Sequence, residues 1–166
     1  MIEETEQDLE AVVTALLGIL GRRGWHLGTA ESLTGGMVGA AITAVPGASA
    51  VYVGGAISYT DHEKTALLGV PADLLQRRGA VSAEVAESMA KGCRELLRVE
   101  VAIATTGVAG PALDGRATPV GTVFVACAMP AECRVERLKL AGDRREIRIA
   151  ATHAALELAL RLVRET

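Results

Sequence analysis

A serine and a lysine occupy positions that suit a nucleophile and a base. Ser32 stands in TAESLTGG, between a short apolar segment and a helix of small residues. The N-terminus of a helix offers unpaired backbone N–H groups and a partial positive charge, and glycines let a substrate approach the backbone. The junction therefore suits a phosphate or the oxyanion of a tetrahedral intermediate. The competing interpretation is that Ser32 or Thr34 simply caps the helix.

Lys64, in SYTDHEK, falls in the first turn of a helix that a capping box of Thr60 and Glu63 is expected to start. A cation at that end opposes the helix dipole. Only three of the 17 basic residues are lysines, and a desolvated lysine can lose its proton whereas arginine cannot. Lys64 is therefore a candidate general base. The alternative is a solvated lysine that pairs with Glu63 or Asp61.

Ser32 and Lys64 each follow a predicted strand, so one sheet can bring them together as a Ser-Lys nucleophile and base. Tyr59 ends the strand before Lys64, and its hydroxyl is a candidate to hold the lysine or relay a proton. A packing tyrosine at the rim is the alternative.

No metal site is predicted. His26, His62 and His153 share no spacing that suggests metal ligands, and the three cysteines form no C-x-x-C or Cys/His pattern. An odd number of cysteines without such spacing is typical of small buried hydrophobes in a reducing compartment.

The pattern of apolar and turn residues predicts a three-layer α/β/α sandwich with a mixed β-sheet, as one domain over residues 1–166. A Gly- and Pro-rich loop at 106–119 is long enough to carry function. A capping box of Asp143 and Glu146 opens the last helix. Strands are predicted at 25–30, 50–59, 99–106, 119–128 and 133–140, and helices at 6–20, 32–44, from 60, within 71–79, at 82–97 and from 143.

Composition excludes several classes of protein. The 166 residues are 50% hydrophobic and 22% charged, which excludes a disordered chain. A net charge of −3 and four aromatic residues predict no nucleic-acid binding. The acidic N-terminus is unlike a signal peptide, and Ser, Thr, Gly and Pro interrupt the uncharged stretch 32–60. We therefore expect a cytoplasmic protein without membrane contact.

Six segments together resemble the CinA C-terminal domain family, in particular its stand-alone nicotinamide mononucleotide amidohydrolases, often called PncC. They are TAESLTGGMVGAAIT, AISYTDHEKTALLGV, GAVSAEVAESMAKG, TTGVAGP, PVGTV and AGDRREIR, and they run in family order. The resemblance implies hydrolysis of the carboxamide of this nucleotide to nicotinate mononucleotide and ammonia, in pyridine nucleotide recycling. It also implies no cofactor, a small-molecule nucleotide as substrate and a homo-oligomer.

The family's motifs carry a serine nucleophile onto Ser32, a lysine base onto Lys64 and an assisting tyrosine onto Tyr59. The candidates for contacts to the substrate or its oxyanion are Thr34, Gly35, Gly36, Thr106 and Gly107. Arg144 and Arg148 are conceivable phosphate partners, although a solvated face is the simpler expectation for both.

Two further functions remain open. One is a non-catalytic module associated with competence or DNA damage, and the other is an amidohydrolase of a different small amide. The second arises because the loop departs from the family's pattern, with Ala112 and Leu113 within a usual G-P-D-G-G segment and Thr118 at a usual lysine.

Overall fold

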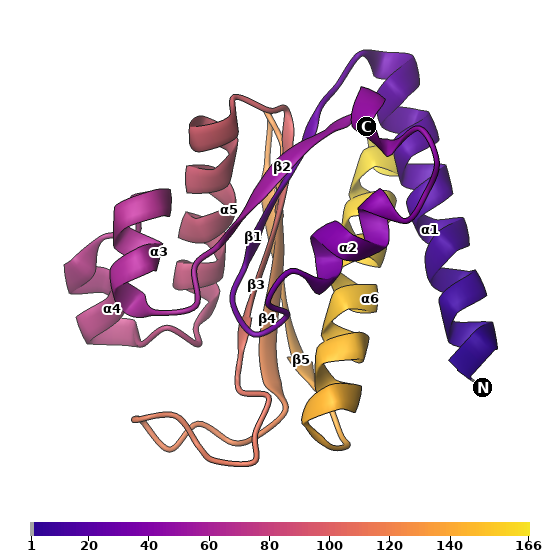
Figure 1. The fold of residues 1–166 in the computed structure, drawn as a ribbon. Coiled ribbons are helices and arrows are strands. Elements are labelled where there is room, and N and C mark those ends of the chain that lie inside the picture. The colour runs from indigo at the N-terminus through magenta and orange to yellow at the C-terminus, as the bar shows by residue number, and fades with distance from the viewer. Residues whose placement is uncertain (1) are drawn as a thin grey trace.

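The computed structural model describes the backbone of residues 2–166 and the side chains from residue 8 onward, so Met1 of the predicted domain lies outside it (Figure 1). The described chain forms one mixed sheet with helices on both faces. In chain order the elements are α1 (Ile2–Arg23), β1 (Leu27–Glu31), α2 (Met37–Thr43), the 3₁₀ helix η1 (Ala48–Ala50), β2 (Tyr52–Ile57), α3 (Asp61–Leu68), α4 (Ala72–Arg78), α5 (Ala83–Leu97), β3 (Val101–Gly107), β4 (Thr122–Ala128), β5 (Cys133–Lys139) and α6 (Arg144–Glu165).

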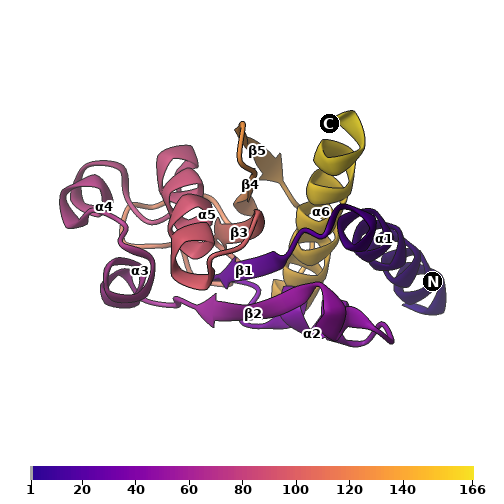
Figure 2. The ribbon, with the colours of Figure 1, turned by 90° about the horizontal axis from the view of Figure 1, so that it is seen from above.

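The five strands are ordered β2-β1-β3-β4-β5. β1 pairs parallel with both β2 and β3, whereas β3, β4 and β5 pair antiparallel. Seen from above, α3, α4 and α5 lie on one side of the sheet, and α1, α2 and α6 lie on the other (Figure 2). The predicted three-layer α/β/α sandwich with a mixed sheet is therefore confirmed.

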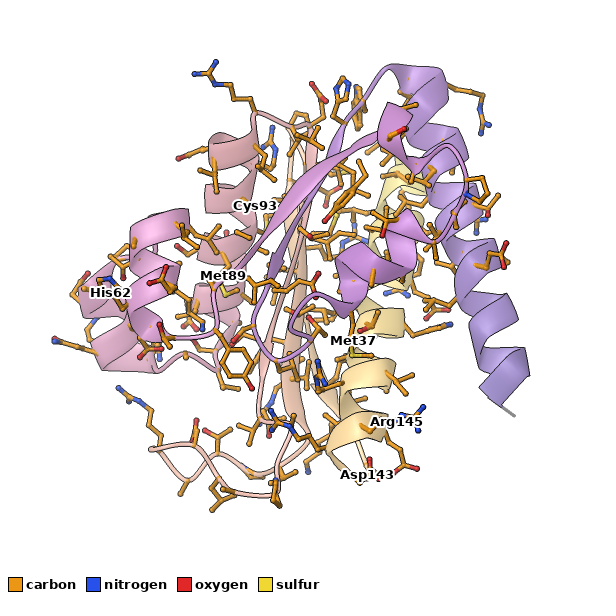
Figure 3. The ribbon with its side chains drawn as sticks, in the orientation of Figure 1. Met37, His62, Met89, Cys93, Asp143 and Arg145 are labelled. Atoms are coloured by element: carbon orange, nitrogen blue, oxygen red, sulfur yellow. The ribbon has the colours of Figure 1, made fainter. Side chains whose placement is uncertain are left out.

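Each face of the sheet covers its own apolar core. α1 and α6 pack on one face around Leu16, Leu20 and Leu158, whereas Met89 and Cys93 lie between α5 and the other face (Figure 3). Residue 92 of α5 is a glycine. A Cβ at this position would clash with the Leu68 carbonyl of α3. This close approach of α5 and α3 fixes the helix that carries Lys64.

Of the two predicted capping boxes, that of Asp143 and Glu146 is complete, whereas that of Thr60 and Glu63 forms only one of its two hydrogen bonds. The Thr60 side chain accepts the Glu63 N–H at the start of α3, and Asp143 and Glu146 form the reciprocal capping box of α6. Most predicted boundaries lie within a few residues of the observed ones, although α1 extends the predicted helix 6–20 in both directions.

The predicted helix 32–44 is wrong in its first half. Residues 32–36 form a turn, and α2 begins only at Met37. Gly35 and Gly36 adopt positive φ angles of 57° and 102°, which are incompatible with a right-handed helix. Ser32 therefore lies in a turn that precedes the helix, rather than at the N-cap.

Candidate active site

The site lies at the carboxyl ends of β1 and β2, where the chain leaves two neighbouring parallel strands toward opposite faces of the sheet. After β1 the chain turns to α2 on one face, and after β2 it turns to α3 on the other (Figures 1 and 2). In open α/β sheets, ligands bind in the crevice at such a switch point. Ser32 follows β1 and Lys64 lies in the first turn after β2, so this crevice holds both.

The structure brings Ser32 and Lys64 together. Lys64 Nζ lies 3.1 Å from Ser32 Oγ and donates a hydrogen bond of 2.8 Å to the Ser58 carbonyl. Only 1% of the Lys64 surface is exposed, whereas Ser32 retains 8%. The amine is thus covered beneath the hydroxyl, and the alternative of a solvated surface lysine is wrong.

Burial lowers the pKa of Lys64 below its ordinary value, because the protein interior disfavours the ammonium form. The Asp61 carboxylate acts in the opposite direction and raises that pKa to a smaller extent. No carboxylate forms an ion pair with Lys64 among the described residues. Within the described residues, the two hydrogen-bond acceptors of Nζ are a hydroxyl and a carbonyl oxygen, so the amine can exist neutral and accept a proton.

Glu31, directly before Ser32, is a buried carboxylate that the sequence reasoning missed. It is 2% exposed and accepts the N–H groups of Gly36, Val38 and Gly39 at 2.8 to 3.1 Å, as well as the Thr34 hydroxyl at 2.7 Å. It therefore caps α2 from the strand end. The available signal was an acidic residue at the end of an otherwise apolar strand.

The predicted substrate-contact residues are largely engaged in the fold itself. The N–H of Gly35 donates to the Ser32 carbonyl, and that of Gly36 donates to Glu31, so neither is free to serve an oxyanion as predicted. Thr34 is fully buried, with its hydroxyl 2.7 Å from that of Thr105.

Beyond the turn, the Thr106 hydroxyl donates to the Ala80 carbonyl, and Gly107 pairs with Val123 in the sheet. A Cβ on Gly107 would approach the Val123 side chain to 2.7 Å. The two residues therefore hold the end of β3 in place, and neither forms a hydrogen bond to Ser32 or Lys64.

Tyr59 is not joined to the pair. Its side chain is 55% exposed, and its hydroxyl accepts a hydrogen bond of 2.7 Å from Arg144, which also donates to the Gly110 carbonyl. The predicted contact of Tyr59 with Lys64 is absent, because the tyrosine lies at the rim while the lysine lies beneath it. The hydrogen bonds of Arg144 instead join the segment that follows β2 to α6 and to the long loop.

Arg148 does not belong to a solvated face, and that expectation was wrong. It is half-buried, and its Nε and Nη2 donate to the carbonyls of Leu33 and Thr34, both at 2.9 Å. The turn that carries Ser32 is thus held by a carboxylate on its N–H groups and by a guanidinium on its carbonyls. Neighbouring Arg145 lies on the outer side of α6, away from the sheet (Figure 3).

The loop 110–118 borders a cavity of about 660 Å³ between itself, α3 and α4. Arg116 lines this cavity, and its guanidinium donates to the carbonyls of Leu75, Gln76 and Arg77 at the end of α4. Asp114 accepts the N–H groups of residues 116 and 118, which orders the loop. From this loop, Asp114, Gly115 and Arg116 line the cavity beside α3 and α4, and none of the three forms a hydrogen bond to Ser32.

Other reactive side chains offer no competing centre. Burial raises the pKa of Cys93 to about 12 and that of Cys133 to about 11, so both thiols stay protonated at neutral pH. His62 points away from the sheet on α3 (Figure 3). Within the described residues, no three His, Cys, Asp or Glu side chains gather closely enough to hold a metal ion.

None of the helices within residues 2–166 combines the length and the apolar character that a bilayer crossing needs.

The fold and the site define a five-stranded mixed α/β unit with a serine and a buried lysine at its switch point. The model of the CinA C-terminal domain matches residues 7–163. The chain belongs to the CinA C-terminal domain family.

Relatives support this assignment. A CinA-like protein of Geotalea daltonii is 44% identical over 150 residues, which are 90% of this chain and 36% of the relative. The chain thus spans little more than a third of the length of that relative. A CinA superfamily protein of Klebsiella pneumoniae superposes with a TM-score of 0.91 and 31% identity, over 95% of this chain and 99% of the other. A competence/damage inducible protein of Agrobacterium tumefaciens gives 0.90 and 34%, over 93% and 95%.

Proposed function

We propose that this chain hydrolyses the carboxamide of nicotinamide mononucleotide, giving nicotinate mononucleotide and ammonia. The observation that carries the proposal is the 3.1 Å approach of a buried, unpaired lysine amine to the Ser32 hydroxyl. The choice of nicotinamide mononucleotide as the substrate rests on the resemblance of the six motifs to the amidohydrolases of the family.

In the first half of the reaction, the neutral amine of Lys64 takes the proton of the Ser32 hydroxyl as Oγ attacks the amide carbon. The hydrogen bond to the Ser58 carbonyl keeps one N–H of the amine occupied, and the lone pair of the neutral amine accepts the proton from Oγ, which lies 3.1 Å away. The tetrahedral intermediate collapses with cleavage of the C–N bond, and Lys64 gives its proton to the departing nitrogen, which leaves as ammonia.

In the second half, water hydrolyses the ester on Ser32. Lys64 accepts a proton from the attacking water, the C–O bond to Oγ breaks, and the proton returns to Ser32. The acid is released and both groups regain their starting states, so no cofactor is consumed.

Other nucleophiles fit less well. Two of the thiols are protonated at neutral pH because burial raises their pKa values, and no histidine forms a hydrogen bond to Ser32 within the described residues. A purely non-catalytic module would have no use for a buried lysine amine without a counter-ion, since burying it is costly. The alternative module role is therefore the weaker proposal.

Ammonia release from the purified protein tests the proposal. We expect release from nicotinamide mononucleotide and none from free nicotinamide, because the remote part of the substrate supplies binding energy. The Ser32→Ala protein gives the background. Release from neither compound by a folded wild-type protein would contradict the proposed substrate.

The rate should depend on pH through Lys64. A base acts only when deprotonated, so kcat/KM is expected to rise with pH and level off above the pKa of Lys64 in the free protein. Burial lowers that pKa, so the midpoint should lie below the ordinary lysine value of 10.5. A profile measured from pH 6 to 10 that falls with pH would exclude the neutral amine as the base.

A different small amide is the second candidate substrate. The contacts of the loop 110–118 favour this candidate, because they provide no free cation for a phosphate. Arg116 is committed to the end of α4 rather than free for a phosphate, and the cavity beside it contains two carboxylates, Asp61 and Asp114. A panel of carboxamides with and without a phosphate distinguishes the two candidates, since a phosphate-independent substrate would show equal kcat/KM for both forms.

A further inference from the structure

The backbone N–H groups around Ser32 are almost all occupied. The Ser32 N–H donates to the Thr105 carbonyl at 3.0 Å, and the Gly35 N–H donates to the Ser32 carbonyl at 3.1 Å. The Glu31 carboxylate takes three N–H groups at the start of α2. Within the described chain, this leaves two N–H groups of the turn without an acceptor, those of Leu33 and Thr34.

The two N–H groups differ in their place relative to the nucleophile, because only that of Leu33 directly follows Ser32. Thr34 is fully buried, whereas Leu33 keeps 3% of its surface exposed beside the 8% of Ser32. A backbone N–H that directly follows the nucleophile also serves as an oxyanion donor in α/β-hydrolases. We propose that the Leu33 N–H donates to the oxyanion that forms when Ser32 attacks. This inference rests on the proposed hydrolase function.

The direction of this N–H is fixed by the fold. In a planar trans peptide, the Ser32 carbonyl and the Leu33 N–H point in opposite directions. Because Gly35 holds that carbonyl inside the turn, the Leu33 N–H points out of it. Arg148 holds the next two carbonyls, those of Leu33 and Thr34, so the peptides that follow cannot rotate.

A donor held in this way needs no reorganisation as charge develops, which is why such donors stabilise a transition state more than water does. Glu31 and Arg148 act as positioning residues here, since they hold the turn from both sides without contacting the reacting atoms. The proposal also accounts for the engagement of Gly35 and Gly36, whose N–H groups build the turn instead of binding the oxyanion.

The test replaces Leu33 by its α-hydroxy acid analogue during translation, which exchanges the N–H for an ester oxygen and keeps the side chain. We expect kcat for nicotinamide mononucleotide to fall about 10²- to 10³-fold. KM should change little, because the lost interaction exists only in the transition state. The comparison makes the same exchange at Thr34, which keeps the Leu33 N–H and only weakens the Leu33 carbonyl as an acceptor for Arg148, so kcat should fall far less than in the protein with the ester at Leu33.

A second readout does not require turnover. A pyridine boronic acid forms a tetrahedral adduct on a serine hydroxyl, with an oxygen in the oxyanion position. Its affinity should fall in the protein with the ester at Leu33, and by much less in the protein with the ester at Thr34. If the ester protein keeps the wild-type kcat and boronate affinity, the Leu33 N–H is not the donor, although the hydrolase function stands.

Two further outcomes are decisive. If the ester protein unfolds below the assay temperature, Leu33→Pro removes the same N–H at the second position of a β-turn, where proline is favoured. A Leu33→Pro protein as active as Leu33→Ala would overturn the inference. A wild-type protein that releases no ammonia from any carboxamide would overturn both this inference and the proposed function.

Discussion

Ammonia release is expected to fall to the same low level in Ser32→Ala, in Lys64→Met and in the double variant. Each single substitution should lower kcat by about 10³-fold or more, since one removes the nucleophile and the other its proton acceptor 3.1 Å away. Groups that act as one unit lose their joint contribution with the first deletion, so the effects should not multiply. Steady-state kinetics of the three proteins measure this.

The control for the lysine is Lys91→Met. Lys91 lies exposed on α5 in an ion pair with Glu87, and its loss should change neither kcat nor stability by much. If the double variant is slower than each single variant by the product of their effects, Ser32 and Lys64 act independently and the proposed proton transfer between them is wrong.

Replacing Glu31 by leucine is expected to destabilise the protein by about 3–5 kcal/mol. The substitution removes four hydrogen bonds to one buried carboxylate and leaves several donors without an acceptor, each of which costs about 1–3 kcal/mol where water cannot replace it. For a chain of this length, the melting temperature should fall by about 10 °C or more. Thermal unfolding followed by circular dichroism measures the change.

The matched control is Glu146→Gln, which alters a carboxylate that accepts one N–H, that of Asp143, at an exposed helix start. We expect that control to cost less than about 1 kcal/mol. Glu31→Gln should lie between the two, because the amide keeps one acceptor oxygen and turns an NH₂ group toward other donors. An unchanged melting temperature in Glu31→Leu would mean that water or a new cap replaces the carboxylate.

The layers of the fold follow from local patterns in the sequence. Thr60 with Glu63 and Asp143 with Glu146 predict where α3 and α6 begin, because a side chain that caps a helix does so within three residues. The pairing of Ser32 with Lys64 was predictable for a related reason, since each residue follows a parallel strand and such strand ends meet at one edge of a sheet.

The rest of the site depends on contacts between residues far apart in the chain. Arg148 reaches Leu33 across 115 positions, and Arg144 reaches Tyr59 across 85. No local pattern distinguishes these arginines from solvated ones. The late start of α2 was missed because Glu31 reaches forward from the strand and takes the N–H groups that a helix starting at Ser32 would have used within itself.

The burial of Lys64 links the state of the site to the folding equilibrium. In the unfolded chain its pKa has the ordinary lysine value of 10.5, whereas burial lowers the pKa in the fold. Between the two values the unfolded chain binds the extra proton, so the free energy of unfolding rises with pH there. Below the folded-state pKa both forms are charged, and the fold carries the whole cost of the desolvated ammonium. The burial of Lys64 thus has two effects. It prepares the amine to accept a proton, and it makes the fold more stable as the pH rises.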